Sequence, residues 1–346
     1  MSLRNTPGGA SGGDLDWAKE DLLVRVAWLY FVEELTQADV AQRMGLSRAR
    51  VIQLLREARQ AKVVSIHISS NSYNCLPLER DVCDRLGLAD AVVVPTPAER
   101  GRLNTALARG AALYLDRTLQ NGEVLGTAWG TTLFEVAKEL APTSQRDITV
   151  VLLLGGLMST LEGMNPNEIA RLLAERFGGK YYGIYVPAIV DTKRSRDVII
   201  NDQSMRETLQ LARAARKAII GIGTADDDAT LLRAGFVGVP MLAELRGKGA
   251  VGDILARYFD VEGRPVASGF DDRIIGHTLE DLREIETVIA VAGGPNKVRP
   301  ILGAVRGGYV DVLVTDETTA RAVLELAGPD GEAATHMRGD EEADGS

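Results

Sequence analysis

The chain has 346 residues, of which 45% are hydrophobic and 25% charged, and its formal net charge is −9. This composition is typical of a globular protein of about two domains. No apolar run approaches the ~18 residues of a membrane-spanning helix, and the N-terminus lacks the apolar segment of a secretory signal. We therefore expect a cytoplasmic protein with no membrane partner.

The ends of the chain, its cysteines and its histidines suggest no chemistry. Residues 1–18 are rich in glycine and residues 328–346 are acidic, so we expect both segments to be disordered. Cys75 and Cys83 have no histidine nearby in the sequence and fit no metal pattern, and a disulfide is not expected in a cytoplasmic protein. The three histidines are scattered along the chain. We therefore predict no metal site, no cofactor and no catalytic residues.

Residues 36–61, TQADVAQRMGLSRARVIQLLREARQA, have the pattern of a helix-turn-helix. Thr36 and Asp39 can form a capping box at the start of the first helix. Gly45 stands where the chain must leave that helix, a position that favours a left-handed residue. Ser47 can then cap the second helix. The inward face of the second helix is formed by Val51, Leu54 and Leu55.

The other face of the second helix carries side chains that suit DNA. Arginine makes bidentate contacts with guanine, and glutamine makes them with adenine. Residues 36–63 hold six basic side chains against two acidic ones, a local charge of +4 in an acidic chain, as a DNA-contacting module requires. An ordinary helical hairpin with a solvated basic face is the alternative. The candidate DNA-contacting residues are Thr36, Gln37, Ser47, Arg48, Arg50, Gln53 and Arg56.

Flanking segments would complete this module. Apolar residues recur at helical spacing before it. They are Leu22, Leu23, Val26, Leu29 and Tyr30. Residues 62–69 alternate in the manner of a strand, where a winged module would place one. We therefore predict a winged helix-turn-helix domain over residues 19–72, followed by a linker over residues 73–88 that is helical from Leu76 to Leu86.

Between residues 89 and 327, apolar strands alternate with helices. Continuous Val/Ile/Leu strands indicate a mostly parallel sheet covered on both faces, so we predict one α/β domain. The expected strands are 91–95, 124–126, 148–154, 182–186, 218–222, 287–292 and 310–315, and the expected helices are 103–119, 133–140, 167–177 and 203–213. The segment 187–201, with Lys193, Arg194 and Arg196, is expected to form a loop near the ligand pocket.

Several of the expected strands end in glycine. In parallel α/β sheets ligands bind beyond the carboxyl ends of the strands, and glycine there permits tight turns and close approach of the backbone to a ligand. Any one of these glycines is explained as a turn residue, but together they predict a pocket. They are Gly126, Gly130, Gly155, Gly156, Gly221, Gly223, Gly293 and Gly294.

Two segments at this edge suit a phosphate group. In residues 126–133, GTAWGTTL, Gly130 precedes Thr131 and Thr132 at a helix start, which offers free N–H groups, two hydroxyls and the positive end of the helix dipole. Lys297 follows a strand-end glycine pair and can reach back as a point charge. A helix cap and a surface lysine are the simpler interpretations. ATP and NAD are disfavoured because no GxxxxGK[ST] is present and no GxGxxG follows the first strand.

Acidic and amide side chains supply further candidates. Asp253 precedes an apolar run that we expect to be helical, and its carboxylate would either accept hydrogen bonds from sugar hydroxyls or cap that helix. Asn167, which opens a helix after the long strand, is another candidate for ligand binding. The acidic cluster 226–228 is expected to cap the helix that follows GIGTA.

The order of motifs along the chain resembles the SorC family of bacterial transcriptional regulators. The segments that carry the resemblance, between about Leu22 and Leu326, are LTQADVAQRMGLSRARVIQLL, WGTTL, GIGTA, VGDILARYFDVEG, DDRIIG, AGGPNKVRPILGAV and VDVLVTDETTA. The resemblance implies an N-terminal winged helix-turn-helix and an effector domain similar to the fold of ribose-phosphate isomerases and glucosamine-phosphate deaminases. It also implies a phosphorylated sugar or polyol-derived effector and a homo-dimer or homo-tetramer on operator DNA.

On this resemblance, Gly130, Thr131, Thr132 and Lys297 hold the phosphate of the effector, and Asp253 meets its hydroxyls. We therefore predict a DNA-binding regulator of carbohydrate or polyol catabolism rather than an enzyme. One alternative is a sugar-phosphate isomerase or deaminase with an added DNA-binding module, because fold does not fix function. Such an enzyme would need a general base, for which the 226–228 cluster is the obvious candidate. Another alternative is a constitutive DNA-binding protein whose α/β domain only oligomerises.

Overall fold

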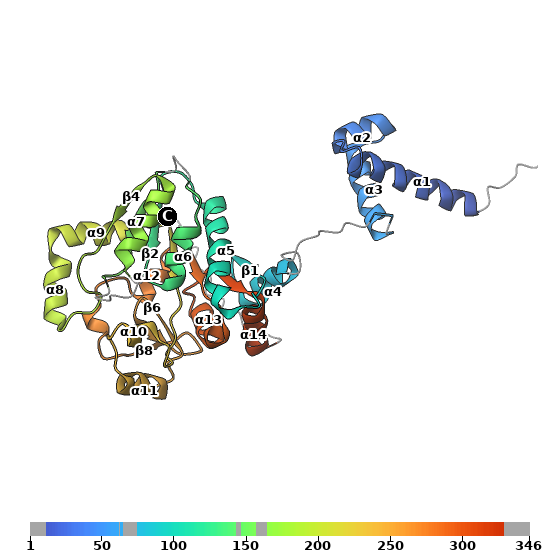
Figure 1. The fold of residues 1–346 in the computed structure, drawn as a ribbon. Helices are drawn as coiled ribbons and strands as arrows, with labels where there is room; N and C mark the ends of the chain where they lie inside the picture. The colour runs from blue at the N-terminus through green and yellow to red at the C-terminus, as the bar shows by residue number, and fades with distance from the viewer. Residues whose placement is uncertain (1–11, 62, 65–74, 143–146, 157–164, 329–346) are drawn as a thin grey trace, which may run out of the picture. The chain divides into compact units, whose positions relative to one another are not determined.

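The structure is a computed structural model that describes residues 12–61, 63–64, 75–142, 147–156 and 165–328 (Figure 1). The chain divides into two compact units, residues 1–69 and 70–346. In the described part of the chain, no helix has the length and apolar character needed to span a bilayer. Each unit has its own hydrophobic core and is described by itself.

The described residues of the first unit form three helices, α1 (Gly12–Phe31), α2 (Gln37–Met44) and α3 (Arg48–Gln60) (Figure 1). Its core holds Leu23, Val26, Ala27, Leu29, Val40, Ala41, Val51, Leu54, Leu55 and Ala58. Val51 and Leu54 are fully buried, and burying a side chain of this size contributes about 1.5–3 kcal/mol. The inward face predicted for the second helix is therefore the face that packs against the other two helices.

The local geometry of the turn confirms the predicted helix-turn-helix. Thr36 and Asp39 form the capping box: the Thr36 hydroxyl accepts from the N–H of Asp39 at 3.3 Å, and the Asp39 carboxylate accepts from the N–H of Thr36 at 3.3 Å. Gly45 ends α2 with φ +67°, and the Ser47 hydroxyl accepts from the N–H of Arg50 at 3.2 Å. Most of the predicted wing strand, residues 62–69, lies outside the described residues.

The second unit begins with α4 (Leu76–Leu86) and is centred on a parallel sheet with strand order β1-β10-β9-β5-β2-β3-β4. The strands are β1 (Asp90–Val94), β2 (Val124–Thr127), β3 (Thr149–Leu152), β4 (Lys180–Tyr182), β5 (Lys217–Gly221), β9 (Thr287–Val291) and β10 (Val312–Asp316). The apolar runs of the inner strands are buried because helices cover both faces of the sheet, as the continuous strand pattern predicted, whereas β4 at the edge is largely exposed.

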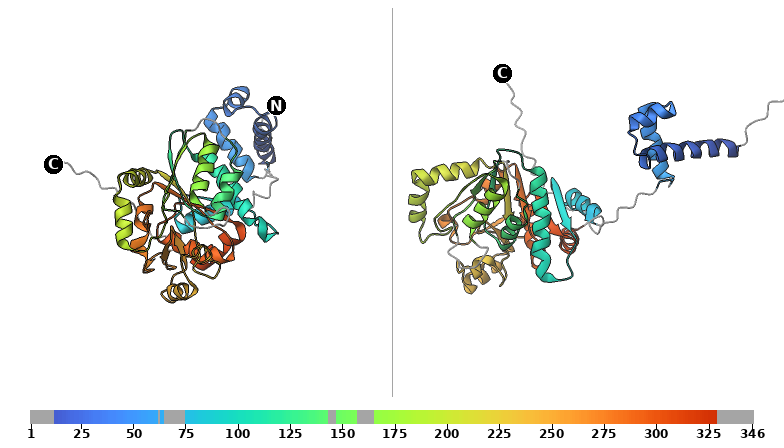
Figure 2. Two further views of the ribbon diagram at one scale, coloured as in Figure 1. Left: turned by 60° about the vertical axis from the view of Figure 1, so that its left-hand side comes forward. Right: turned by 45° about the horizontal axis from the view of Figure 1, so that its top comes forward.

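The covering helices form two layers, visible in Figure 1 and in the two further views of Figure 2. One layer contains α5 (Leu103–Thr118), α6 (Thr131–Glu139) and α7 (Pro166–Phe177), which pack side by side. On the other side, α14 (Glu317–Ala327) packs between α13 (Val298–Arg306) and α4, while α9 (Gln203–Arg213) contacts β2 and β3. Further helices of this unit are α10 (Thr230–Arg233), α11 (Val239–Gly247) and α12 (Leu279–Arg283).

A small antiparallel sheet joins this unit and corrects one prediction. It consists of β6 (Gly252–Ile254), β7 (Arg257–Phe259) and β8 (Pro265–Val266). Asp253 therefore lies in a strand, and the expectation of a helix after it was wrong. The run that follows is apolar because β6 and β7 are buried in the core, and periodicity alone does not separate a short buried strand from a buried helix.

The segment 187–201 is a second correction. Its latter part is the helix α8 (Lys193–Asn201), not a loop. The Thr192 hydroxyl caps α8 by accepting from the N–H of Ser195 at 3.0 Å. α8 has no buried residue, so the apolar periodicity that marks a core-facing helix is absent from its sequence. The other predicted strands and helices of the sheet exist, with bounds shifted by a few residues; the largest shift is the predicted strand 182–186, found at Lys180–Tyr182.

Candidate functional site

The strand order places a pocket at the switch point of the sheet. From β2 the chain runs outward through β3 and β4, and then returns to β5 on the other side of β2. Crevices form at such reversals, beyond the carboxyl ends of the strands. A pocket of about 290 Å³ opens there, lined by segments that follow β2, β5 and β9. This volume suits a small ligand, since drug-sized sites begin at about 300 Å³.

The segment after β2 presents the start of α6 to this pocket. Gly130, Thr131 and Thr132 line it. Gly130 has φ +146°, which side chains rarely allow, and α6 begins directly after it without a side-chain cap on its first N–H groups. These groups and the positive helix end are therefore available to an anion. Thr132 contacts the Asn104 amide oxygen from α5 at 3.4 Å, which orients its hydroxyl within the site.

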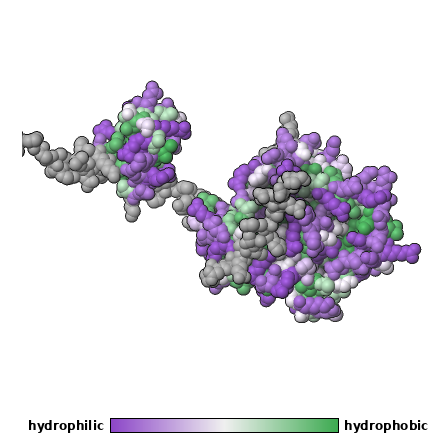
Figure 3. All heavy atoms as spheres, turned by 180° about the vertical axis from the view of Figure 1, so that it is seen from behind, coloured by the Kyte–Doolittle hydropathy of each residue, from purple (hydrophilic) through white to green (hydrophobic). Residues whose placement is uncertain are grey.

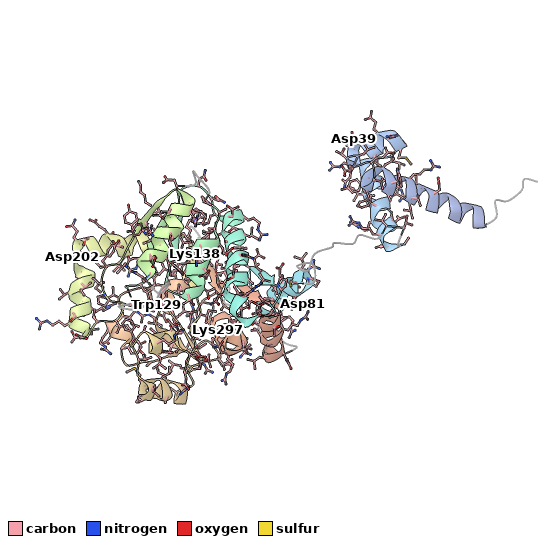
Figure 4. All side chains as sticks on the ribbon, viewed as in Figure 1. Asp39, Asp81, Trp129, Lys138, Asp202 and Lys297 are labelled. Atoms are coloured by element: carbon pink, nitrogen blue, oxygen red, sulfur yellow. The ribbon has the colours of Figure 1, made fainter. Side chains whose placement is uncertain are left out.

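Lys297 and Asp253 line the same pocket and lie close to each other. The Lys297 ammonium donates to the Ile222 carbonyl at 2.6 Å, and Asp253 is almost fully buried beside it. Burial raises the pKa of Asp253 to about 6, although the charge of Lys297 acts in the opposite direction. Burial also lowers the pKa of Lys297, an effect that Asp253 opposes. Figure 4 shows Lys297 and Trp129, both pocket-lining residues, within the second unit.

The backbone around Asp253 is shaped to hold its carboxylate in place. A Cβ on Gly223 would lie 1.9 Å from the Asp253 carboxylate, so only glycine fits there. The turn between β6 and β7 consists of Leu255 and Ala256, at φ +53° and +63°, a left-handed conformation that costs non-glycine residues about 1–2 kcal/mol each. The N–H of Ala256 donates to Asp253, which limits the rise of its pKa. Strain of this kind is concentrated at functional sites.

Other residues of the pocket had no counterpart among the sequence predictions. Arg233, from the four-residue helix α10, is the most informative of them. It is exposed, and none of the described residues forms an ion pair with it. Asn104 from α5 and Asn296 from the turn after β9 add amide groups. No motif marks these residues, because they come from separate segments that only the fold brings together.

Several predicted residues lie away from the pocket. Asn167 does not line it: its amide nitrogen donates to the Ile184 carbonyl at 3.3 Å, beyond the end of β4. Lys193 and Arg194 lie on the surface at α8, in a hollow of their own. Of the eight strand-end glycines, four line the pocket: Gly130, Gly221, Gly223 and Gly293.

The acidic cluster 226–228 has a different local role from the predicted one. Asp226 accepts from the Thr224 hydroxyl at 2.6 Å and from the N–H of Asp228 at 3.0 Å, so it closes a turn. The following helix, α10, starts after Ala229 without a side-chain cap. The prediction of a helix cap was therefore wrong, because the acidic residues stand too far before the helix to reach its first N–H groups.

In the first unit, α3 carries the candidate DNA-contacting residues on its outer face. Arg48, Gln53 and Arg56 are exposed. Arg50 is half-buried, with a nitrogen 3.6 Å from the Glu57 carboxylate, and the Gln53 amide donates to the same carboxylate at 2.9 Å. Glu57 therefore holds two of the candidate side chains in place.

The remaining candidates lie at the helix starts. The hydroxyls of Thr36 and Ser47 accept from backbone N–H groups and so act as helix caps. Gln37, the first residue of α2, is half-buried.

Comparison with known proteins identifies the class of both units. A family model described as "Putative sugar-binding domain" matches residues 70–325, and one described as "Sigma-70, region 4" matches residues 25–61. The transcriptional regulator LsrR of Klebsiella pneumoniae is 35% identical over 317 residues, 90% of this chain and 94% of that protein. The deoxyribonucleoside regulator of Bacillus subtilis is 33% identical over 312 residues, 90% of this chain and 99% of that protein.

A solved structure agrees with these relatives. The full-length sorbitol operon regulator SorC from Klebsiella pneumoniae is 28% identical, with a TM-score of 0.70, over 88% of this chain and 98% of that one. A helix-turn-helix unit joined to a sugar-binding α/β unit is the architecture of a sugar-responsive transcriptional regulator. The chain belongs to the SorC family of these DNA-binding regulators.

Proposed function

We propose that this protein controls a carbohydrate or polyol operon, and that a small phosphorylated sugar or polyol in the pocket controls its binding to operator DNA. The names of its relatives, which include a sorbitol operon regulator and an erythritol catabolism regulatory protein, support the class of operon. One observation supports a phosphorylated ligand: uncapped N–H groups at the start of α6 line the same pocket as Lys297 and Arg233.

The phosphate of the effector would lie at the start of α6. Gly130 and the two threonines after it offer N–H groups and hydroxyls, and charge-assisted hydrogen bonds of this type contribute about 1.5–3 kcal/mol each. Lys297 adds a cation whose position is set by its bond to the Ile222 carbonyl. The exposed Arg233 is free of ion pairs with described residues and adds the second cation.

The sugar or polyol hydroxyls would face Asp253. A buried carboxylate that has one backbone donor, Ala256, keeps acceptor capacity for hydroxyl groups. An unphosphorylated sugar would leave the cations and the α6 N–H groups without a partner, so it should bind much more weakly. The pocket should therefore discriminate by phosphate first and by hydroxyl pattern second.

We propose that the pocket serves as a sensor and has no catalytic role. An isomerase or deaminase would need a general base close to the substrate. In the acidic cluster that the sequence offers for this role, Asp226 already accepts hydrogen bonds from the Thr224 hydroxyl and the N–H of Asp228. Asp253 lines the pocket, but it lies beside the Lys297 cation and accepts from the N–H of Ala256, contacts that suit a fixed hydrogen-bond acceptor. The relatives are named as transcriptional regulators, which also favours a sensor.

Operator binding would use α3, with Arg48, Arg50, Gln53 and Arg56 as the contacting residues. One recognition helix offers a small interface, so we propose that a homo-dimer or homo-tetramer engages paired half-sites about 34 Å apart, or at multiples of that spacing. The effector would shift the population between two arrangements of the DNA-binding units. The shift can be no larger than its differential affinity for them.

A ligand panel tests the proposal. Thermal unfolding of the full chain would be measured with phosphorylated sugars and polyols, each beside its unphosphorylated form, while turnover is followed by NMR. At 100 times its Kd a ligand should stabilise the protein by about 2.7 kcal/mol. The same compounds would be added to complexes with DNA selected from a random library. A compound that stabilises the protein without phosphate, or one that is converted, would contradict the proposal.

A further inference from the structure

Residues 293–297, which we call the pocket turn, connect β9 to α13 and are bonded to the start of α14. Three residues of the turn, Lys297 among them, line the pocket. The N–H of Gly294 donates to the Thr319 hydroxyl at 2.7 Å and to the Asp316 carboxylate at 3.2 Å. Asp316 ends β10, Thr319 belongs to the first turn of α14, and both are buried. The pocket turn is therefore attached to α14 through buried polar groups.

These contacts fix the pocket turn against α14. A Cβ on Gly293 would lie 2.6 Å from the Asp316 carboxylate, so the backbone of the turn lies directly against that side chain. The Thr319 hydroxyl donates to the same carboxylate at 2.5 Å, and the carboxylate caps α14 by accepting from the N–H of Thr319. Separating the turn from α14 would leave buried polar groups unsatisfied, which is costly. A displacement of the turn therefore moves the start of α14 with it.

The other end of α14 is bonded to α4. The Arg85 guanidinium, from α4, donates to the Leu324 carbonyl at 2.8 Å and to the Gly328 carbonyl at 2.6 Å. Carbonyl groups at a helix end have no partner within the helix, so Arg85 supplies one. α14 has 11 residues and is roughly 16 Å long, and Figure 1 shows it beside α4. α14 therefore connects the pocket turn to α4.

α4 is the first described element of the second unit, so it is the part of this unit that follows the helix-turn-helix in the chain. A second polar contact holds it to the sheet, because the Glu79 carboxylate accepts from the N–H of Val93 at 2.9 Å. β1 is an edge strand, and Glu79 bonds to its open side. α14 and β1 thus hold α4 at separate points. A shift of α14 changes one attachment and leaves the other in place, which reorients α4 on the sheet edge.

The two sides of α4 differ in character. Leu78 and Val82 are buried against the second unit, whereas Arg80, Asp81 and Asp84 are exposed. Figure 4 labels Asp81 on this helix, and hydrophilic side chains predominate on the face of the second unit that Figure 3 shows. The contacts that position α4 within this unit therefore lie on its inner side, where α14 and the sheet edge meet it.

We propose that a phosphate bound at the pocket turn acts on α4 through α14, with Asp316 and Thr319 as positioning residues at one end and Arg85 at the other. We call these contacts the α14 link. None of the three residues lines the pocket. The inference rests on the proposed function for its ligand: a phosphate that draws Lys297 toward the start of α6 displaces the turn, and the turn moves α14. The link transmits only the binding free energy that differs between the two positions of the turn.

Hydrogen exchange in the full chain tests the link, with inorganic phosphate as the probe. In the wild type, phosphate should slow exchange at residues 128–133, in the pocket turn and in α4. The effect on α4 should be about fivefold, the lower end of typical coupling between sites. Thr319→Val removes a hydroxyl that holds Gly294, so α4 should no longer respond. Thr315→Val is the matched control, because the Thr315 hydroxyl is equally buried and has no partner among the described residues; α4 should respond as in the wild type.

A second pair of variants interrupts the far end of the link. Arg85→Met should abolish the response of α4 while the pocket turn is still protected by phosphate. Arg283→Met is its control, since Arg283 donates to the Gly307 carbonyl at 2.8 Å at the end of α13, and should leave the response intact. The double variant of Thr319→Val with Arg85→Met should lose no more than either single variant, because both interrupt the same link.

The outcomes separate the link from the proposed function. Protection of the pocket turn without protection of α4 in the wild type overturns the link, and so does a wild-type response of α4 in Thr319→Val. If phosphate protects neither the turn nor residues 128–133, the proposed phosphate site fails, and exchange without ligand decides the link. Thr319→Val and Arg85→Met should then each speed exchange in α4 but not in α7, and the two increases should not add. Additive increases, or none, overturn the link.

Discussion

The two units place their functional residues in different ways. In the helix-turn-helix, all the candidate DNA-contacting residues lie within residues 36–56, and the caps and the apolar spacing that orient them lie in the same stretch. The pocket is lined by residues from Asn104 to Lys297, which reach one another only through the order of the strands. Local patterns therefore determine the first site, whereas the topology of the sheet determines the second.

The prediction with the largest expected effect is that the first unit can be unfolded while the second unit stays folded. Val51→Asp places an unpaired charge in a fully buried position of α3, which should cost about 4 kcal/mol or more and unfold the first unit. Circular dichroism and limited proteolysis would follow its loss. Thermal stabilisation by the effector should persist, because the pocket belongs to the other core.

The neighbouring residue supplies the control. Ile52 is 40% exposed on the same helix, so Ile52→Asp should leave the fold intact even if it alters DNA binding. If Val51→Asp also abolishes effector binding, the two units do not fold independently and the comparison fails.

The second prediction concerns the stability of the pocket against pH. Because burial raises the folded-state pKa of Asp253 from 3.8 to about 6, the folded state holds its proton more tightly than the unfolded state does. The contribution of Asp253 to the free energy of unfolding is therefore greatest below pH 4. It falls as the pH rises to about 6 and is constant above that, a loss of about 3 kcal/mol at most. Urea unfolding of wild type and Asp253→Asn from pH 4 to 7 would measure it as a difference.

An exposed carboxylate gives the opposite sign. Hydrogen bonds from Ser204 lower the pKa of Asp202 at the start of α9, so its contribution is lost as the pH falls. Asp202→Asn should therefore remove a contribution to the free energy of unfolding that rises with pH, whereas Asp253→Asn removes one that falls with pH. A wild-type profile that runs parallel to that of Asp253→Asn would show that the Asp253 carboxyl titrates normally.

The third prediction separates sensing from DNA binding. Lys297→Ala removes one charge-assisted bond to the effector phosphate, worth about 1.5–3 kcal/mol, or roughly 10- to 150-fold in affinity. Operator binding without effector should stay at the wild-type value. Arg233→Ala should weaken the effector in the same direction but less, because Arg233 is more exposed. Calorimetry gives the affinities, and fluorescence anisotropy gives the DNA response.

Arg246→Ala is the control for the loss of a cation, since Arg246 pairs with Asp227 outside the pocket. If Lys297→Ala and Thr131→Val both respond to the cognate phosphate at wild-type concentrations, the effector binds elsewhere.

The sequence predicts the helix-turn-helix site more fully than the pocket, for a physical reason. The capping box, Gly45 and the Val51 face depend on neighbours three or four residues apart, so periodicity and cap chemistry were enough. In the pocket, glycines and threonines at the start of α6 could be predicted from strand ends. Arg233 could not, because α10 has four residues and no periodicity.

The segments that were wrongly predicted also depend on contacts between residues far apart in the sequence. The hairpin that holds Asp253 turns through Leu255 and Ala256 rather than the Asn-Gly typical of such turns, so its sequence does not mark a hairpin. Glycine at position 223 was expected for a turn. It is required because the Asp253 carboxylate, thirty residues later in the sequence, leaves no room for a side chain there. Contacts between distant segments leave no local pattern in the sequence.

The fourth prediction tests the locally determined site. Arg48→Ala or Arg56→Ala should cost about 1–3 kcal/mol in operator binding. A base-contacting arginine would also lose sequence discrimination, whereas a phosphate-contacting one would lower affinity evenly and reduce the dependence on salt. Anisotropy titrations at several salt concentrations, with selected and scrambled DNA, distinguish the two roles. Unchanged binding when Arg48, Arg50, Gln53 and Arg56 are all alanine would refute the assignment of α3.

The smallest expected effect concerns Glu57, which holds Arg50 and Gln53 from the next turn of α3. Glu57→Gln keeps the length of the side chain and removes its charge, so the ion pair with Arg50 is lost while a hydrogen bond to Gln53 remains possible. A partly exposed ion pair contributes less than about 1 kcal/mol to stability, so the melting temperature should hardly change.

Removing an acid beside DNA phosphates should raise non-specific affinity, while freeing Arg50 should lower discrimination between operator and scrambled DNA. If discrimination instead stays constant as affinity rises, Glu57 acts only through its charge and does not position Arg50. Glu33→Gln, which frees Arg43 on α2 from a similar ion pair of 3.0 Å, is the matched control and should leave discrimination unchanged.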